Sequence, residues 1–194
     1  MAASEIYALS EEGSLRQGEL LSGIVQFKRV VGDDETVDEP RIVNVTHPYA
    51  VIVTQDCDLV WDFQARQKQS GTHKQLLSIL FCEVTEAKSF RSGRSDIKSD
   101  IWRRIKTNKN ERYQFLEQVP QELDSQRAGV PDLCIDFKRC FCLATEDVYW
   151  QLEKSLATRR CRMVSPYAEH LTSRFFYFQS RVALPREHGK EPSR

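Results

Sequence analysis

The densest run of functional side chains is Thr54-Gln55-Asp56-Cys57-Asp58, which directly follows the apolar stretch Tyr49-Ala50-Val51-Ile52-Val53. A strand that ends in five polar groups presents them at the edge of a sheet, where binding and catalytic residues are common. Asp56 and Asp58 could bind a divalent cation through carboxylate oxygens, and Cys57 could act as a nucleophile if a helix N-terminus favours its thiolate. The alternative is structural: Asp58 caps a helix, Gln55 and Asp56 hold the turn, and Cys57 fills space.

His47 is the candidate for proton transfer. It precedes Pro48 at the entry to the apolar stretch. An imidazole at a sheet edge, with an ordinary pKa near neutrality, suits general acid–base catalysis. The alternative is a histidine in an exposed connecting loop.

The cysteines give a weaker indication of a metal site. Cys140 and Cys142 are two residues apart, so on a strand they face one side and could form half of a zinc site if Cys57 or Cys161 converged on them. Buried, reduced cysteines explain the same residues, and no CxxC pair is present. We therefore expect no metal and no cofactor.

A basic segment is the candidate nucleic-acid interface. Between Arg91 and Arg112 the chain carries eight basic and three acidic residues, although its formal net charge is zero. Cations interleaved with aromatic side chains, here Trp102 and Tyr113, bind phosphates and stack on bases. The alternative is a solvated helix face. The candidate contacts are Arg103, Arg104, Lys106, Lys109 and Arg112.

The strands that must position these residues follow from the apolar pattern. Strands are expected over 18–31, 41–45, 49–53, 76–84, 112–116 and 133–137, with His47-Pro48 as a break. The apolar stretch 49–53 predicts the central strand, buried on both faces. The acidic, turn-rich residues 32–40 predict a solvated hairpin loop.

Four helices are expected. They cover 58–67 after an Asp58 cap, 95–106, 145–152 after Thr145, and the segment from Pro166 to Pro185. The last one carries an apolar stripe that should dock on the sheet, formed by Leu171, Phe175, Phe178 and Val182.

Length and composition indicate one domain. The 194 residues are 40% hydrophobic and 29% charged, and no apolar run approaches the roughly 20 residues of a membrane-spanning helix. The N-terminus is acidic and lacks the features of a secretory signal. We therefore expect a soluble, cytoplasmic protein with no membrane partner. Its predicted parts are a flexible N-terminus (1–14), a single β-barrel-based domain with helical insertions (15–185) and a disordered tail (186–194).

Three segments within residues 15–90 together resemble the PemK/MazF family of small-barrel toxins. They are Leu15-Arg16-Gln17-Gly18-Glu19-Leu20, His47-Pro48-Tyr49-Ala50-Val51-Ile52-Val53-Thr54 and Phe81-Cys82-Glu83-Val84-Thr85-Glu86-Ala87-Lys88. The resemblance implies an α+β fold, a small SH3-like β-barrel with inserted and C-terminal helices that is often a homodimer. It also implies cleavage of single-stranded RNA without a metal, with the ribose 2′-hydroxyl as nucleophile, and neutralisation by an antitoxin.

The resemblance assigns roles to individual residues. Thr85 stands where the family has a threonine, which could hydrogen-bond a phosphate oxygen. His47 stands where the family has an arginine before the Pro-led strand, so stabilising the charged phosphorane would need another donor such as Arg41 or Arg16. The Gln55–Asp58 cluster is not part of the family pattern.

Three hypotheses follow. The first is a metal-independent endoribonuclease of a bacterial toxin–antitoxin or phage-defence module, with His47 as acid or base, Thr85 as phosphate contact and the Arg103/Arg104 face binding RNA. The second is a non-catalytic protein-interaction subunit of a larger defence or regulatory complex, with contacts made by the 54–58 turn and the C-terminal helix. The third is a metal- or thiol-dependent enzyme centred on Asp56, Cys57 and Asp58.

Overall fold

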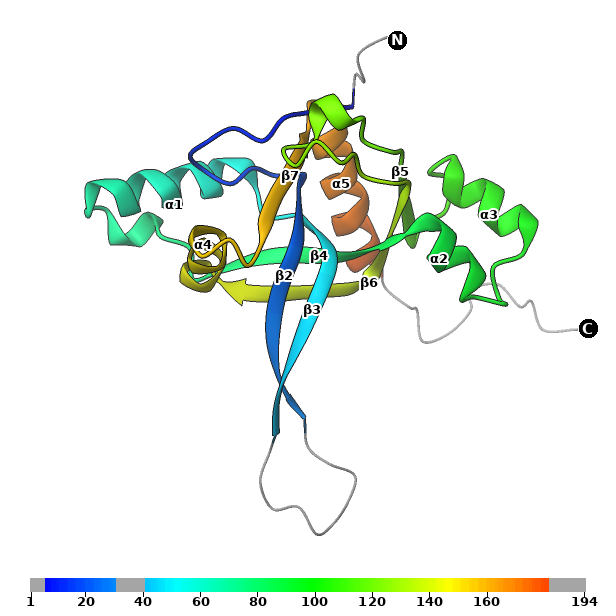
Figure 1. Cartoon of the computed structure of the whole chain (residues 1–194), viewed down its shortest axis with the longest axis horizontal. Helices are drawn as coiled ribbons and strands as arrows, with labels where there is room; N and C mark the ends of the chain where they lie inside the picture. The colour runs from blue at the N-terminus through cyan, green and yellow to red at the C-terminus, as the bar shows by residue number, and fades with distance from the viewer. Residues whose placement is uncertain (1–5, 31–40, 182–194) are drawn as a thin grey trace, which may run out of the picture.

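The computed structural model describes residues 6–30 and 41–181, which form one seven-stranded antiparallel sheet with helices around it (Figure 1). The strand order is β1-β7-β2-β3-β4-β6-β5. The strands are β1 (Tyr7–Ala8), β2 (Glu19–Val30), β3 (Arg41–Ile52), β4 (Ser78–Glu86), β5 (Tyr113–Leu116), β6 (Leu133–Ala144) and β7 (Thr158–Met163). Because β3 is fourth of seven, the predicted central strand is confirmed.

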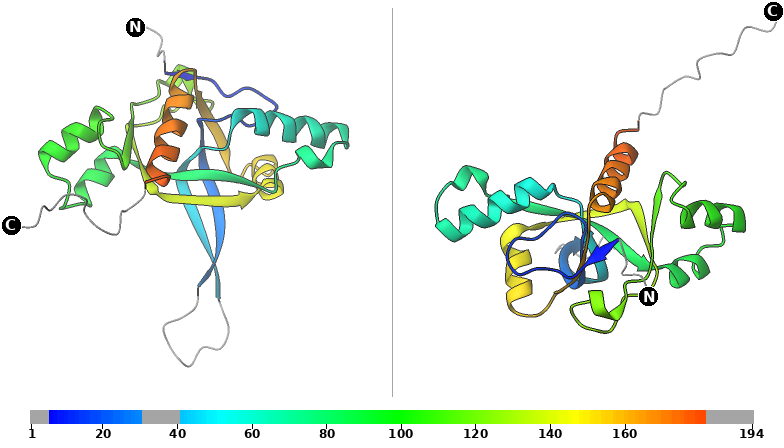
Figure 2. Two further views of the ribbon diagram at one scale, coloured as in Figure 1. Left: turned by 180° about the vertical axis from the view of Figure 1, so that it is seen from behind. Right: turned by 90° about the horizontal axis from the view of Figure 1, so that it is seen from above.

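The helices lie at the two ends of the sheet and across one of its faces. Helices α1 (Asp56–Lys68) and α4 (Thr145–Glu153) lie at one end, and α2 (Ala87–Ser92) and α3 (Ser99–Lys106) lie at the other (Figure 1). Helix α5 (Tyr167–Gln179) packs across the sheet, as the view from behind shows (Figure 2). Two short 3₁₀ helices cover Thr72–Lys74 and Gln121–Leu123. None of the helices within residues 6–30 and 41–181 combines the length and the apolar composition that spanning a bilayer requires.

The α+β class is confirmed, but the expected closed barrel is not. Strands β1 and β5 form the two edges of the sheet and do not pair with each other within the described residues. The edges still approach one another, because the Tyr7 hydroxyl on β1 donates a hydrogen bond to the Glu117 carbonyl just after β5 (2.9 Å). The sheet is therefore strongly curved but open.

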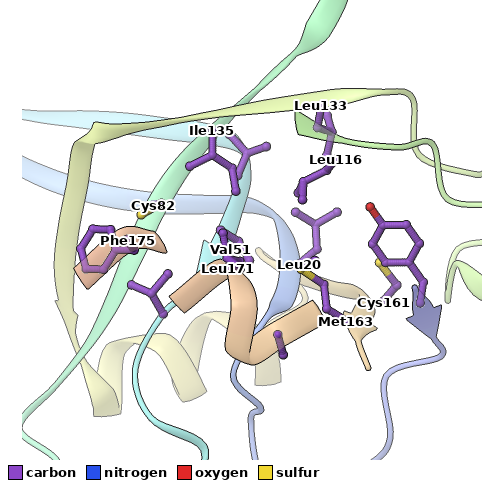
Figure 3. Packing of buried hydrophobic residues seen from close by; sticks show 14 of the residues in the cluster. Leu20, Val51, Cys82, Leu116, Leu133, Ile135, Cys161, Met163, Leu171 and Phe175 are labelled. Atoms are coloured by element: carbon purple, nitrogen blue, oxygen red, sulfur yellow. The ribbon is translucent and has the colours of Figure 1, made fainter. Parts of the chain in front are cut away.

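The main core lies between the curved sheet and α5 (Figure 3). Val51 on β3 and Ile135 on β6 are buried against Leu171, Phe175 and Phe178 of α5. The predicted docking of the aromatic stripe is confirmed for these three residues, and Val182 lies outside the described residues. Burial of a large aromatic side chain stabilises the fold by roughly 1.5–3 kcal/mol, so α5 depends on this face of the sheet.

Two smaller cores hold the end helices. Leu59 of α1 and Val148 of α4 pack against Ile52 and Phe81 of the sheet. At the other end, side chains of α2, α3 and β5 form their own cluster, composed of Ala87, Phe90, Ile97, Ile105, Tyr113, Phe115 and Cys134, with Ile101 and Trp102 packed against it. This cluster holds α2 and α3 and shares no residue with the main core.

The break predicted at His47-Pro48 is wrong, because β3 runs without interruption from Arg41 to Ile52. Proline has no N–H to donate, so inside a sheet it is confined to positions whose N–H would not hydrogen-bond to the neighbouring strand. Pro48 meets this condition opposite Gly23, where β2 adopts a left-handed φ of 78°. A side chain at Gly23 would also collide with the Leu156 carbonyl, since a Cβ there would lie 2.9 Å from that oxygen.

Several boundaries differ from those predicted. Helix α1 begins at Asp56 with Gln55 as the N-cap, so Asp58 is inside the first turn and does not cap. Strand β1, helix α2 and strand β7 were not predicted. Strand β1 lies in the segment expected to be a flexible N-terminus (1–14), yet it pairs with β7. A six-residue helix is too short to show a period, and the sequence of β7 is Thr-Arg-Arg-Cys-Arg-Met. The predicted hairpin loop at 32–40 and the tail at 186–194 lie outside the described residues, although β2 and β3 pair as a hairpin requires.

Replacing Phe175 by Ala should destabilise the protein by about 3–5 kcal/mol, because it opens a cavity between α5 and β6. The neighbouring Phe176→Ala substitution is the matched control, since Phe175 is 2% exposed and Phe176 is 45% exposed. Urea unfolding measures both free energies. Equal losses for the two variants would contradict the docking of α5 through Phe175.

Candidate functional site

A small polar pocket lies between β4, β6 and α2, with a volume of about 170 Å³. Strand β4 contributes Glu83 and Thr85, which are two residues apart and therefore face the same side. Strand β6 contributes Asp136 and Arg139, and Arg94 reaches in from the segment after α2. Carboxylate, hydroxyl and guanidinium groups from three parts of the chain thus converge on one cavity.

The side of the pocket formed by Glu83, Thr85 and Arg139 keeps unused hydrogen-bonding capacity. Arg139 Nε lies 3.1 Å from Glu83 Oε2 in an ion pair that solvent reaches from the Arg139 side. The Thr85 hydroxyl forms no hydrogen bond within the described residues. A ligand entering the pocket would therefore meet a free hydroxyl beside a single, exposed ion pair.

The other wall of the pocket is held by ion pairs. Arg112 donates two hydrogen bonds to the Asp136 carboxylate, at 2.8 and 2.6 Å. Arg94 donates to Asp96 (2.8 Å) and to the Tyr113 hydroxyl (2.9 Å). The hydrogen bond to Asp96 raises the pKa of Arg94, and burial raises the pKa of Tyr113. This wall is consequently charged but largely satisfied.

His47 lies next to the pocket and does not line it. Its ring is 3% exposed and stacks on Phe141 with a centroid separation of 4.0 Å. Its Nε2 lies 3.4 Å from Gln26 Oε1. Burial lowers the pKa of His47, Lys28 and Arg139 act in the same direction, and Glu83 opposes them. Burial therefore favours the neutral imidazole, and Glu83, which lines the pocket, is one of the charged groups that act on it.

The Thr54–Asp58 run lies at the opposite end of the same two strands. The β3–β4 register pairs Ile52 with Phe81 at that end and Tyr49 with Val84 toward the pocket. The structure therefore brings His47 and Thr85 into one region and keeps Asp56, Cys57 and Asp58 apart from both.

Within that run, Asp56 is fully engaged. Arg16 donates to both of its carboxylate oxygens at 2.7 Å, and the Gln17 N–H donates at 3.1 Å. Burial opposes ionisation, yet these hydrogen bonds hold the pKa of Asp56 below its usual value. Cys57 is exposed at the first turn of α1, with Sγ 3.8 Å from Asp58 Oδ1.

The two arginines named as substitute donors for the phosphorane do not reach the pocket. Arg16 binds Asp56 at the far end of β3. Arg41 pairs with Val30 where the β2–β3 ribbon extends away from the rest of the molecule (Figure 1). The guanidinium groups that line the pocket together with Thr85 are those of Arg94 and Arg139.

The basic candidates fall into two groups. Arg103, Arg104, Lys106 and Lys109 are exposed, and none of the four forms an ion pair with any residue of 6–30 or 41–181. Arg112 differs, because its guanidinium is bound to Asp136 inside the wall of the pocket.

Potential metal ligands do not gather in the described part of the chain, where no group of three His, Cys, Asp or Glu side chains could hold an ion. Cys140 and Cys142 are exposed on β6. Cys161 is buried in the main core, where burial raises its pKa to about 12. The six cysteines are free thiols.

Sequence reasoning did not single out Glu83, Arg94, Asp136 or Arg139. A signal for Glu83 was present, since it precedes Thr85 by two residues in a predicted strand. No comparable signal existed for Arg139, because its position depends on a register shift between β4 and β6.

The depressed pKa of His47 makes stability depend on pH. The unfolded chain, with the ordinary histidine pKa of about 6.5, binds more protons than the folded chain below that pH. The wild type should therefore lose stability as pH falls from about 8 to about 5.5, and His47→Phe should lose less, since it keeps an aromatic ring on Phe141 without a titrating group. Urea unfolding at both pH values tests this, with exposed His73→Gln as control. An unchanged pH dependence in His47→Phe would refute the assignment.

No protein-family model, no curated protein and no solved structure matches the chain. A functional assignment must therefore rest on the side chains of the pocket and on the exposed cations Arg103, Arg104, Lys106 and Lys109.

Proposed function

We propose that the protein is a PemK/MazF-like endoribonuclease that cleaves single-stranded RNA without a metal, with its reaction centre in the pocket between β4, β6 and α2. The observation that supports this is the convergence of Glu83, Thr85 and Arg139 on one cavity. Exposed cations on the neighbouring α3 supply attraction for the phosphate backbone. The open sheet is then a variant of the SH3-like barrel, and the protein acts in the cytoplasm within a toxin–antitoxin or phage-defence module.

The chemistry needs only these three side chains and water. Glu83 accepts the proton of a ribose 2′-hydroxyl, and the 2′-oxygen attacks the adjacent phosphorus. The bond from phosphorus to the 5′-oxygen breaks, and the leaving oxygen takes a proton from water. The products carry a 2′,3′-cyclic phosphate and a 5′-hydroxyl.

Two donors stabilise the charge that develops in this step. Arg139 faces the phosphorane as a cation, and Thr85 donates its free hydroxyl to a non-bridging oxygen. His47 is buried, so direct proton transfer passes to Glu83 in this proposal.

The test is incubation of the purified protein with a labelled, mixed-sequence single-stranded RNA in EDTA. Cleavage should proceed and leave cyclic phosphate ends, and the matching DNA should stay intact because it has no 2′-hydroxyl. Glu83→Gln should slow cleavage by about 100-fold or more, and Thr85→Val by about tenfold.

Glu86→Gln is the matched control, since Glu86 is an exposed carboxylate on the same strand and does not line the pocket. Its rate should equal that of the wild type. Absence of cleavage by the wild type, or an unchanged rate in Glu83→Gln, would reject the proposal.

A second candidate function, a non-catalytic interaction subunit, is favoured by an apolar groove between α1 and α4. The groove has a volume of about 410 Å³ and is lined by Phe63, Tyr149 and Trp150, among others. Trp150 is 48% exposed at this groove, and exposed tryptophans are typical of protein interfaces.

Affinity purification followed by mass determination separates the two functions. A stoichiometric protein partner that is lost in Trp150→Glu, together with no cleavage of RNA, would establish the interaction subunit. A partner found together with cleavage would instead be the expected behaviour of a toxin with its antitoxin.

A further inference from the structure

A second pocket lies on the other side of α2, between α2, α3 and β5. Its volume is about 500 Å³, within the range of small-molecule sites. Lys88 and Arg91 enter it from α2, Trp102 and Lys106 from α3, and Phe115 from β5. The cluster of apolar side chains beneath α2 and α3 holds these elements in place.

The charges around this groove are uncompensated. Lys88, Arg91 and Lys106 form no ion pair within residues 6–30 and 41–181. The groove contains one carboxylate, Asp132, whose Oδ1 already accepts a hydrogen bond from the Gln118 N–H (2.9 Å). The groove therefore favours an anionic ligand.

Two aromatic rings line the groove together with its cations. Trp102 and Phe115 meet edge to face with their centroids 6.1 Å apart. The Arg91 guanidinium lies 5.5 Å from the Trp102 ring, and Lys106 Nζ lies 5.9 Å from the Phe115 ring. Both cations therefore lie within 6 Å of the aromatic rings that line the groove.

We propose that this groove binds one unpaired base of a single-stranded nucleic acid, with Trp102 stacking on the base and Lys88, Arg91 and Lys106 binding the flanking phosphates. An isolated phosphate would leave the rings unused, and an apolar ligand would leave the cations unused. A nucleotide satisfies both, because aromatic side chains and a positive groove are the two means by which proteins hold single strands.

The position of the groove links it to the proposed reaction centre. Ser89 and Phe90 of α2 line the pocket of Thr85, and Lys88 and Arg91 of the same helix line the groove. A strand held in the groove would reach the pocket by crossing one short helix. That RNA is the natural ligand rests on the proposed function, whereas the stacking site itself does not.

The test uses the intrinsic fluorescence of Trp102. The chain has three tryptophans, and Trp61 and Trp150 are exposed, so the double variant Trp61→Phe/Trp150→Phe reports on Trp102 alone. Titration with a 2′-O-methyl single-stranded RNA, which the proposed mechanism cannot cleave, should quench this fluorescence. Duplex RNA of the same sequence should quench it less, because its bases are not free to stack.

Substitutions then measure the contributions to binding. Trp102→Leu should weaken binding of the same oligonucleotide by about 5- to 100-fold, whereas Trp150→Leu should leave it unchanged. Arg91→Gln, at an exposed position that does not threaten folding, should weaken binding and lower the salt dependence by about one phosphate contact. Circular dichroism confirms that each variant is folded.

The outcomes separate this inference from the proposed function. Quenching and loss of affinity in Trp102→Leu support the groove even if no RNA is cleaved. Cleavage that depends on Glu83, together with wild-type affinity in Trp102→Leu and Arg91→Gln, would overturn the groove and leave the reaction centre standing. No quenching by any single strand would also overturn it.

Discussion

The register shift between β4 and β6 is the constraint on which the pocket depends. Cys82 faces Cys140 and Val84 faces Ile135, so four residues of β6, Asp136 to Arg139, lie opposite Glu83 alone. A strand with extra residues must bend and turn its side chains out of the regular alternation. The bend sends Phe137 into the core against Phe175 and leaves Asp136 and Arg139 facing the pocket. A regular β6 would provide neither the cavity nor its guanidinium.

A net charge of zero conceals an unequal distribution of ion pairs. The arginines of β7 are each matched by a carboxylate: Arg159 by Glu19, Arg160 by Asp124 and Arg162 by Glu11. The hydrogen bonds from Arg160 hold the pKa of Asp124 below its usual value. Removing one partner of such a buried pair leaves an uncompensated charge, which is costly. The cations of α2 and α3 lack such partners in the described residues, so that side of the molecule carries exposed, unpaired positive charge.

The sequence predicted well those elements whose side chains follow one period. The stripe of Leu171, Phe175 and Phe178 indicated both a helix and the face it buries, and the apolar run at 49–53 indicated the central strand. Strand β7 was not predicted because its arginines are neutralised by residues far along the chain, which no local pattern reveals. The strand break predicted at Pro48 was wrong for a similar reason, since Gly23, which accommodates the proline, belongs to the neighbouring strand. At the pocket, the sequence analysis named Thr85, whereas Glu83 and Arg139, which line the same cavity, depend on the three-dimensional register.

The run from Thr54 to Asp58 shows why reactive residue types alone do not define a site. The Thr54 hydroxyl accepts the Leu80 N–H at 2.8 Å, and Asp56 binds Arg16 and Gln17. These bonds tie the start of α1 to β4 and to the segment before β2, so they secure one end of the β3–β4 pair.

The pocket lies at the other end of that pair. Both oxygens of Asp56 are occupied, whereas the hydroxyl of Thr85 has no partner in the described chain. Catalysis and binding need groups that can still form a hydrogen bond, and the Thr85 hydroxyl is such a group.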